Sequence, residues 1–174
     1  MLRITHLSTT HRLAVIGAAI LVAAAIGTGV TRAAVPTAVV IQSSTVLDRT
    51  TMHPGPAGSQ GTFQGLVSGT FTSSGAVNDA GDESTVVTFS GIYAPDLSST
   101  HGVTTLTGAD GTITLRWQAL HHPFEDPSFS GSWVLADATG AYAGLQGSGT
   151  VTFTVSGEAT LYPHLTELWT GSLS

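Results

Sequence analysis

The sequence contains no cysteine and no lysine, and charged residues make up only 9% of its 174 residues. Without cysteine the chain can form no disulfide, no thiolate metal site, no cysteine nucleophile and no lipid-modified cysteine. The formal net charge is −6, and five arginines carry all of the permanent positive charge. Because so few cations could neutralise a run of phosphates, nucleic acid is not expected as a partner.

The N-terminal segment has the three parts of a secretory signal peptide. Residues 1–12 contain two arginines and no acidic residue, residues 13–30 are uncharged and apolar, and small residues stand at positions 31 and 33. This order predicts export, with cleavage near Ala33 or Ala34, so that residues 1–33 are the signal peptide. Retention of residues 13–30 as a membrane anchor is the alternative, since eighteen apolar residues almost reach spanning length.

Removal of the signal peptide leaves residues 34–174 as a strongly acidic single domain. Two arginines, Arg49 and Arg116, then stand against eleven acidic residues, a net charge of −9. Such a domain should avoid nucleic acid and anionic surfaces, and no stable membrane insertion is expected after cleavage. A homo-oligomer is compatible with the sequence.

The remaining chain is rich in glycine, serine and threonine and shows no long helical periodicity. Its β-branched and aromatic runs, separated by Gly, Pro, Asp and Ser clusters, predict strands. A loop rich in proline and glycine, residues 53–60, follows the first run, and Asp110-Gly111 predicts a tight hairpin between the fourth and fifth. The eight predicted runs are 38–48, 61–72, 84–93, 101–107, 112–121, 128–136, 149–156 and 159–171.

Alternation within these runs indicates sheets with one apolar face. Leu115 and Trp117 share a face opposite Arg116, and Phe153 shares a face with its apolar neighbours at 151 and 155. No helix is available to cover a second layer, so we expect the sheet to close into an eight-stranded antiparallel barrel, which also removes exposed edges. A two-sheet sandwich is the alternative.

Two clusters of polar residues could suggest metal sites, but each is interpreted as a loop. Residues 78–83, which include Asp79, Asp82 and Glu83, are expected to form a charged hairpin tip, because their spacing does not supply a calcium-binding series. Residues 121–127 contain two histidines and two carboxylates, and they are expected to form a solvated loop. No metal and no cofactor are therefore expected.

Glu167 and Arg116 are the candidate polar groups of a ligand pocket. Glu167 shares its strand face with Leu165 and Trp169, and an unpaired carboxylate inside a barrel is costly. If both pointed inward, they would form a polar spot in an apolar pocket. The alternative is that Glu167 and Arg116 both face water, and the alternation favours an outward Arg116. The candidate pocket comprises Glu167, Arg116, Trp117, Phe153 and Trp169, and packing of the aromatic rings in the core is the competing interpretation.

Residues 132–149 carry the most distinctive pattern, in which Thr139-Gly140 turns the chain, residues 141–145 make a tight helical turn, and Gln146-Gly147-Ser148-Gly149 starts the next strand. This segment resembles the Gly-Thr-Gly-aromatic connection of the allene oxide cyclase-like and dirigent-like barrels, and residues 111–116 and 131–133 resemble small exported actinobacterial members. Asp137-Ala138 departs from that pattern, in which a glycine pair is more usual. The residues assigned to the structural turn are Thr139, Gly140, Tyr142, Gly144 and Gly147, with the ring of Tyr142 expected to close the barrel end.

The resemblance implies an eight-stranded antiparallel barrel with a small, mostly apolar cavity, but it implies no particular reaction. The leading hypothesis is an exported barrel that binds or shields a small apolar molecule rather than an enzyme. One alternative is a cofactor-free cyclase or isomerase that acts on a hydrophobic substrate. A structural or protein-interaction module at the cell envelope is the other.

Overall fold

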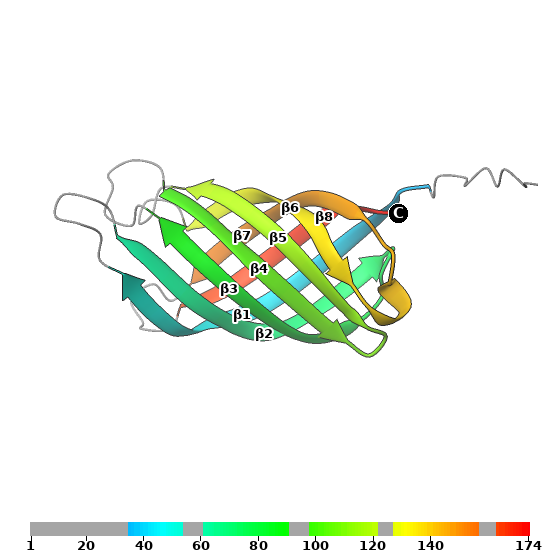
Figure 1. The fold of residues 1–174 in the computed structure, drawn as a ribbon, viewed down its shortest axis with the longest axis horizontal. Coiled ribbons are helices and arrows are strands. Elements are labelled where there is room, and N and C mark those ends of the chain that lie inside the picture. The colour runs from blue at the N-terminus through cyan, green and yellow to red at the C-terminus, as the bar shows by residue number, and fades with distance from the viewer. Residues whose placement is uncertain (1–34, 54–60, 91–97, 122–126, 157–162) are drawn as a thin grey trace, which may run out of the picture. The chain divides into compact units, whose positions relative to one another are not determined.

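The computed structural model describes residues 35–53, 61–90, 98–121, 127–156 and 163–174, in which eight antiparallel strands close into a barrel (Figure 1). Each strand pairs with its neighbour in the sequence, and β8 returns to pair with β1 from Thr37↔Leu173 to Val46↔His164. The predicted eight-stranded antiparallel barrel is confirmed, and the sandwich alternative is wrong. The strands are β1 (Thr37–His53), β2 (Thr62–Gly75), β3 (Ala80–Ser90), β4 (Ser98–Gly108), β5 (Thr112–His121), β6 (Ser128–Ala138), β7 (Gly147–Ser156) and β8 (His164–Leu173).

The strands form because apolar or small residues alternate with polar ones along most of the chain. In β2, for example, Val67 and Phe71 are buried while Thr70 is exposed. An antiparallel sheet with one apolar face satisfies this pattern when that face lines the inside of the barrel. Closure by β1 and β8 pairs the first strand with the last, which removes the two long edges of an open sheet that could recruit other chains.

The β3 strand begins earlier than the sequence predicts. It starts at Ala80 rather than at Ser84, so the expectation that residues 78–83 form a hairpin tip is wrong for Asp82 and Glu83. Asn78 makes the actual turn, because its side chain donates to the carbonyl of Gly75 and accepts from the same residue's N–H. Glu83 thereby acquires a position inside a strand, with its side chain on the lumen side.

Two irregularities in pairing bend the barrel wall. The β1–β2 register shifts between Leu47 and Arg49, and the β5–β6 register shifts between Thr114 and Leu115. Bulges of this kind increase local twist and help a sheet to curl. The β5–β6 shift lies opposite residues 135–137 of β6. This stretch includes Asp137, one of the two residues that stand where the barrels it resembles more usually have a pair of glycines.

A short 3-10 helix, η1 (Gly140–Tyr142), joins β6 to β7 at one end of the barrel. Gly140 and Gly144 adopt positive φ angles of 62° and 87°, which explains glycine at both positions. Tyr142 is buried against the core, and its hydroxyl donates to Asp79 Oδ2 at 2.7 Å. Asp79 also accepts the backbone N–H groups of Ala80, Ala109 and Asp110, so one carboxylate ties two hairpin turns to η1.

The core of the barrel is aromatic and aliphatic. Trp133 and Trp169 are almost completely buried, and the indole N–H of Trp133 is shared between the carbonyls of Thr150 and Thr170. Small residues face the large rings: a Cβ at Gly102 would lie only 2.6 Å from the Trp117 ring. Among the described residues, no helix is long and apolar enough to cross a membrane.

The predicted signal peptide and the loop between β1 and β2 cannot be compared with the structure. Residues 1–34 and 54–60 lie outside the described residues, as do residues 122–126 of the histidine-containing loop. Cleavage near Ala33 or Ala34, export and the anchor alternative therefore stay predictions.

Candidate functional site

The lumen contains two buried carboxyl groups, from strands on either side of the β1–β2 pair. Glu83 on β3 and Glu167 on β8 are each only 2% exposed. Glu167 is the cross-strand partner of Ser43 on β1. Two residues further along β1, Thr45 pairs with Gly69 of β2, and Gly69 pairs in turn with Glu83 of β3. The closed register therefore carries both acids into the same part of the lumen.

The two carboxyl groups influence each other's protonation. Desolvation raises the pKa of Glu167 well above its ordinary value, and the nearby charge of Glu83 raises that pKa further. Desolvation also raises the pKa of Glu83, but hydrogen-bond donors around it act in the opposite direction. Two such acids cannot both ionise at close range without a cation, so the pair retains a proton at a pH where isolated glutamates have lost theirs.

A chain of hydroxyl groups shows which acid holds the negative charge. The Thr85 hydroxyl donates to Glu83 Oε1 at 3.2 Å, so its oxygen accepts the proton of Thr104, 2.7 Å away. The Thr104 oxygen accepts in turn from the indole N–H of Trp117 at 3.1 Å. Every donor in this chain points toward Glu83, and aligned hydrogen bonds strengthen one another in a low-dielectric interior.

Glu167 is therefore the member that keeps the proton. Its Oε1 accepts one hydrogen bond, from Thr45 at 3.1 Å, whereas the threonine chain stabilises the negative charge of Glu83. The arrangement places a neutral carboxylic acid next to a carboxylate inside an apolar barrel. Environments that push the pKa values of two acids apart in this way are typical of functional sites.

Four buried polar atoms around the pair make no hydrogen bond of normal geometry. They are Ser43 Oγ, Glu83 Oε2, Glu167 Oε2 and Trp169 Nε1. The Ser43 hydroxyl nevertheless lies close enough to lower the pKa of Glu83, and the Trp169 N–H lies close enough to lower the pKa of Glu167. The two carboxyl groups also lie close enough for hydrogen bonding between them to lower the pKa of Glu83 and to raise that of Glu167, so the four groups are loosely paired with one another. Buried polar groups in proteins are normally satisfied, so this concentration needs an explanation.

Aromatic rings form the wall beside Glu167. Phe153 of β7 is its direct cross-strand neighbour, and its ring lies 4.5 Å from that of Trp117 and 5.9 Å from that of Trp169. The two indoles meet edge to face at 6.5 Å, and the ring of Phe129 stacks on that of Phe153 at 4.9 Å. Such edge-to-face and stacked contacts fix the rings in place.

The structure brings together four of the five residues of the candidate pocket. Glu167, Trp117, Phe153 and Trp169 are buried on the lumen side of the barrel. Arg116 is exposed on the outer face, where it pairs across the sheet with Val103 and Val134, so the possible Glu167–Arg116 pair is not formed. Trp117 and Leu115 occupy the inner face of β5, as the alternation favoured.

Glu83 is the site residue that the sequence interpretation missed. Its acidic neighbours suggested a turn, yet Glu83 has the same parity as Thr85 and Val87, both buried, while Asp82 and Ser84 are exposed. Extending the period-two pattern backwards from Val87 would have placed Glu83 inside. Local charge density concealed this signal.

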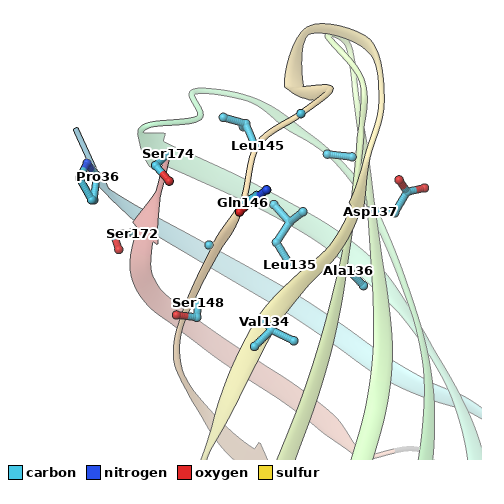
Figure 2. Close-up of a pocket in the computed structure, with 13 residues that line it drawn as sticks. Pro36, Val134, Leu135, Ala136, Asp137, Leu145, Gln146, Ser148, Ser172 and Ser174 are labelled. Carbon is cyan, nitrogen blue, oxygen red and sulfur yellow. The ribbon is translucent and has the colours of Figure 1, made fainter. Parts of the chain in front are cut away.

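A groove opens on the outside of the barrel (Figure 2). It has a volume of about 830 Å³ and opens where β6 separates from β7, beyond the last pair Val134↔Ser148. Leu135 and Gln146 face each other across it, and the C-terminal Ser172 and Ser174 border its other side. Its lining mixes apolar side chains such as Val134 and Leu145 with serines and with the carboxylate of Asp137, and it is widely open to solvent.

The described residues show no group of three or more histidine, aspartate or glutamate side chains that could hold a metal ion. Comparison with known proteins gives no family for the chain: no family model matches it, and no curated protein matches its sequence.

Proposed function

We propose that the barrel binds a small, largely apolar molecule in its lumen, with one polar group of that molecule held between Glu83 and Glu167. The observation that carries this proposal is the buried pair of carboxyl groups, in which Glu83 Oε2 and Glu167 Oε2 make no hydrogen bond of normal geometry. A guest polar group would give these atoms partners, and the aromatic wall would cover its apolar part. Apolar pockets with a few convergent polar groups are the usual form of small-molecule sites.

The chemistry of the pair explains why it would be kept in the fold. Burying two acids without a cation destabilises a barrel, and apolar residues of the same volume would avoid that cost. Eight-stranded barrels of this size hold either packed side chains or one small ligand. The proposal includes export of the domain and the kinship with allene oxide cyclase-like and dirigent-like barrels that residues 132–149 suggest.

The test is native mass spectrometry of the full chain, purified gently from its own host. A wild-type protein that carries a small molecule, matched by a Glu83→Gln/Glu167→Gln double variant that emerges without it, would support the proposal. The Asp82→Asn variant is the matched control, because Asp82 is the exposed neighbour of Glu83. A bare mass for wild-type protein from several gentle preparations would overturn the proposal.

A cofactor-free cyclase or isomerase is the second candidate, favoured by the neutral carboxylic acid that Glu167 provides. An acid that stays protonated in an apolar site can donate a proton to a developing charge, and the barrel would hold a flexible substrate in a reactive shape. Cyclisation and isomerisation conserve mass. A recovered molecule incubated with fresh protein should therefore change its chromatographic retention at constant mass, and Glu167→Gln should abolish the change. An unaltered retention time would exclude this candidate.

A further inference from the structure

The outer wall of the barrel has an apolar row that runs across adjacent strands. Leu66, Val86 and Val103 lie on β2, β3 and β4, and each is the direct cross-strand partner of the next. Arg116 of β5 continues the row, because it pairs with Val103. We call these four residues the outer row, and the strands to which they belong lie side by side along the wall (Figure 1).

The apolar members of the outer row are exposed. The side chains of Leu66, Val86 and Val103 are 40%, 51% and 40% exposed. Single apolar side chains are common on protein surfaces, whereas a contiguous set of them indicates an interaction surface. Leu168 of β8 is an exposed leucine of the single kind, because its cross-strand neighbours are a glutamine and a threonine.

Polar side chains without a carboxylate surround the outer row. The outward positions two residues before and after each member contain no acidic residue, although the domain has eleven acidic residues against two arginines. These positions are Gln64, Ser68, Ser84, Thr88, His101, Thr105, Thr114 and Gln118. An apolar centre with a polar rim, few charges and an arginine is the usual composition of a protein–protein interface.

We propose that the outer row binds the outer row of a second copy of the chain, so that the protein is a two-fold symmetric dimer. In such a dimer the same patch serves both copies, and the copies meet through side chains because β8 pairs with β1 and closes the sheet. The two-fold axis lies between Val86 and Val103, parallel to the strands. Val86 of each copy then packs on Val103 of the other, and Arg116 lies over Leu66. This inference is independent of the lumen and its ligand.

The positions of the charges favour this arrangement over others. Asp48 is exposed at the β1–β2 register shift and accepts a hydrogen bond from Ser68, the outward neighbour of the row on β2. Arg116 stands at the opposite end of the row, so a facing copy turned end for end brings each Arg116 beside Asp48 of the other copy. An axis along the row would instead bring the two copies of Arg116 together, which opposite charges avoid. Arg49, which follows Asp48 on β1, comes to the side of β6 of the second copy, where Asp137 is exposed.

Sedimentation equilibrium of the protein purified from its own host measures the association. We expect a dimer that dissociates on dilution. Val86→Thr/Val103→Thr replaces two exposed apolar side chains by polar ones of similar shape, and should weaken dimerisation about tenfold or more. Leu168→Thr is the matched control, because it removes an equally exposed apolar side chain outside the row, and it should leave the dissociation constant of the dimer unchanged.

Charge reversal tests the arrangement of the two copies. Arg116→Asp and Asp48→Arg should each weaken dimerisation about tenfold, because each brings like charges together across the interface. The double variant Arg116→Asp/Asp48→Arg restores opposite charges and should recover the wild-type dissociation constant. Recovery in the double variant cannot result from misfolding of the single variants, and its failure would overturn the two-fold arrangement.

Two other outcomes would overturn the proposal. One is a wild-type protein that stays monomeric at about 1 mM, whether or not a different molecule covers the outer row. The other is an oligomer that survives Val86→Thr/Val103→Thr unchanged, or that contains three copies, because a single two-fold contact joins only two. Neither outcome bears on the lumen, which is tested separately by the mass of the protein with its guest.

Discussion

Replacement of Glu167 by glutamine should remove much of the pH dependence of the barrel's stability on the neutral side of pH 4.5. Burial raises the pKa of Glu167 above the ordinary value of 4.5 for glutamate, and the adjacent Glu83 raises it further. Below pH 4.5 the folded and unfolded chains both hold the proton, so the pair costs little. Above pH 4.5 the unfolded chain releases the proton while the folded barrel keeps it, so the free energy of unfolding falls as pH rises.

The size of this effect follows from proton linkage. A difference of one bound proton changes the free energy of unfolding by about 1.4 kcal/mol per pH unit. The wild type therefore loses stability by this amount for each pH unit over which the folded barrel keeps the Glu167 proton and the unfolded chain has released its own. Glutamine has the same shape and can still accept from Thr45, but it does not titrate, so the Glu167→Gln variant should show a shallower profile, in which only the raised pKa of Glu83 contributes.

The assay is urea denaturation at several pH values, followed by tryptophan fluorescence. The exposed Asp82 provides the control variant Asp82→Asn, which should retain the wild-type slope. Glu83→Gln should behave differently from Glu167→Gln, because it removes the charge that raises the pKa of Glu167 and so moves the titration of Glu167 to lower pH. Equal slopes in the wild type and in Glu167→Gln would refute the assignment of the retained proton to the pair.

Three further predictions concern packing and the barrel end. Gly102→Ala should destabilise the protein by about 1–3 kcal/mol in urea and shift the tryptophan emission, because the new methyl group would overlap the Trp117 ring; an unaltered emission and stability would contradict this contact. Tyr142→Phe should lower the melting temperature at neutral pH, because the hydrogen bond from the Tyr142 hydroxyl holds the pKa of Asp79 below the ordinary 3.8. That stabilisation is present above pH 3.8 and is lost as the pH falls. The melting temperatures of the wild type and the variant should therefore converge in acid, and a constant difference between them would contradict this account. Trp133→Ala should cost about 3–5 kcal/mol, since the indole is 1% exposed, and a loss below about 1 kcal/mol would show that the site collapses around the cavity.

The strand pattern could be predicted from the sequence because it is local. The period-two alternation around Trp117 and Phe153 placed their side chains on the inner face, and Asp110-Gly111 marked the hairpin that the bond from Gly108 N–H to the Gly111 carbonyl closes. The apolar neighbours of Glu167 on β8 left both an inward and a water-facing side chain open, and the structure buries it. The strand boundaries were less certain: β3 begins four residues earlier than predicted, and this difference concealed Glu83.

The partner of Glu167 could not be predicted in the same way. Glu83 and Glu167 are 84 positions apart, and they meet only because β8 pairs with β1 while β1 and β2 carry the sheet onward to β3. Side-chain alternation determines which face of a strand is apolar, but it does not set the register between distant strands or the closure of the sheet. Local sequence therefore determined the strands and their inward faces, whereas only the closed tertiary structure decided that two acids share one proton in the lumen.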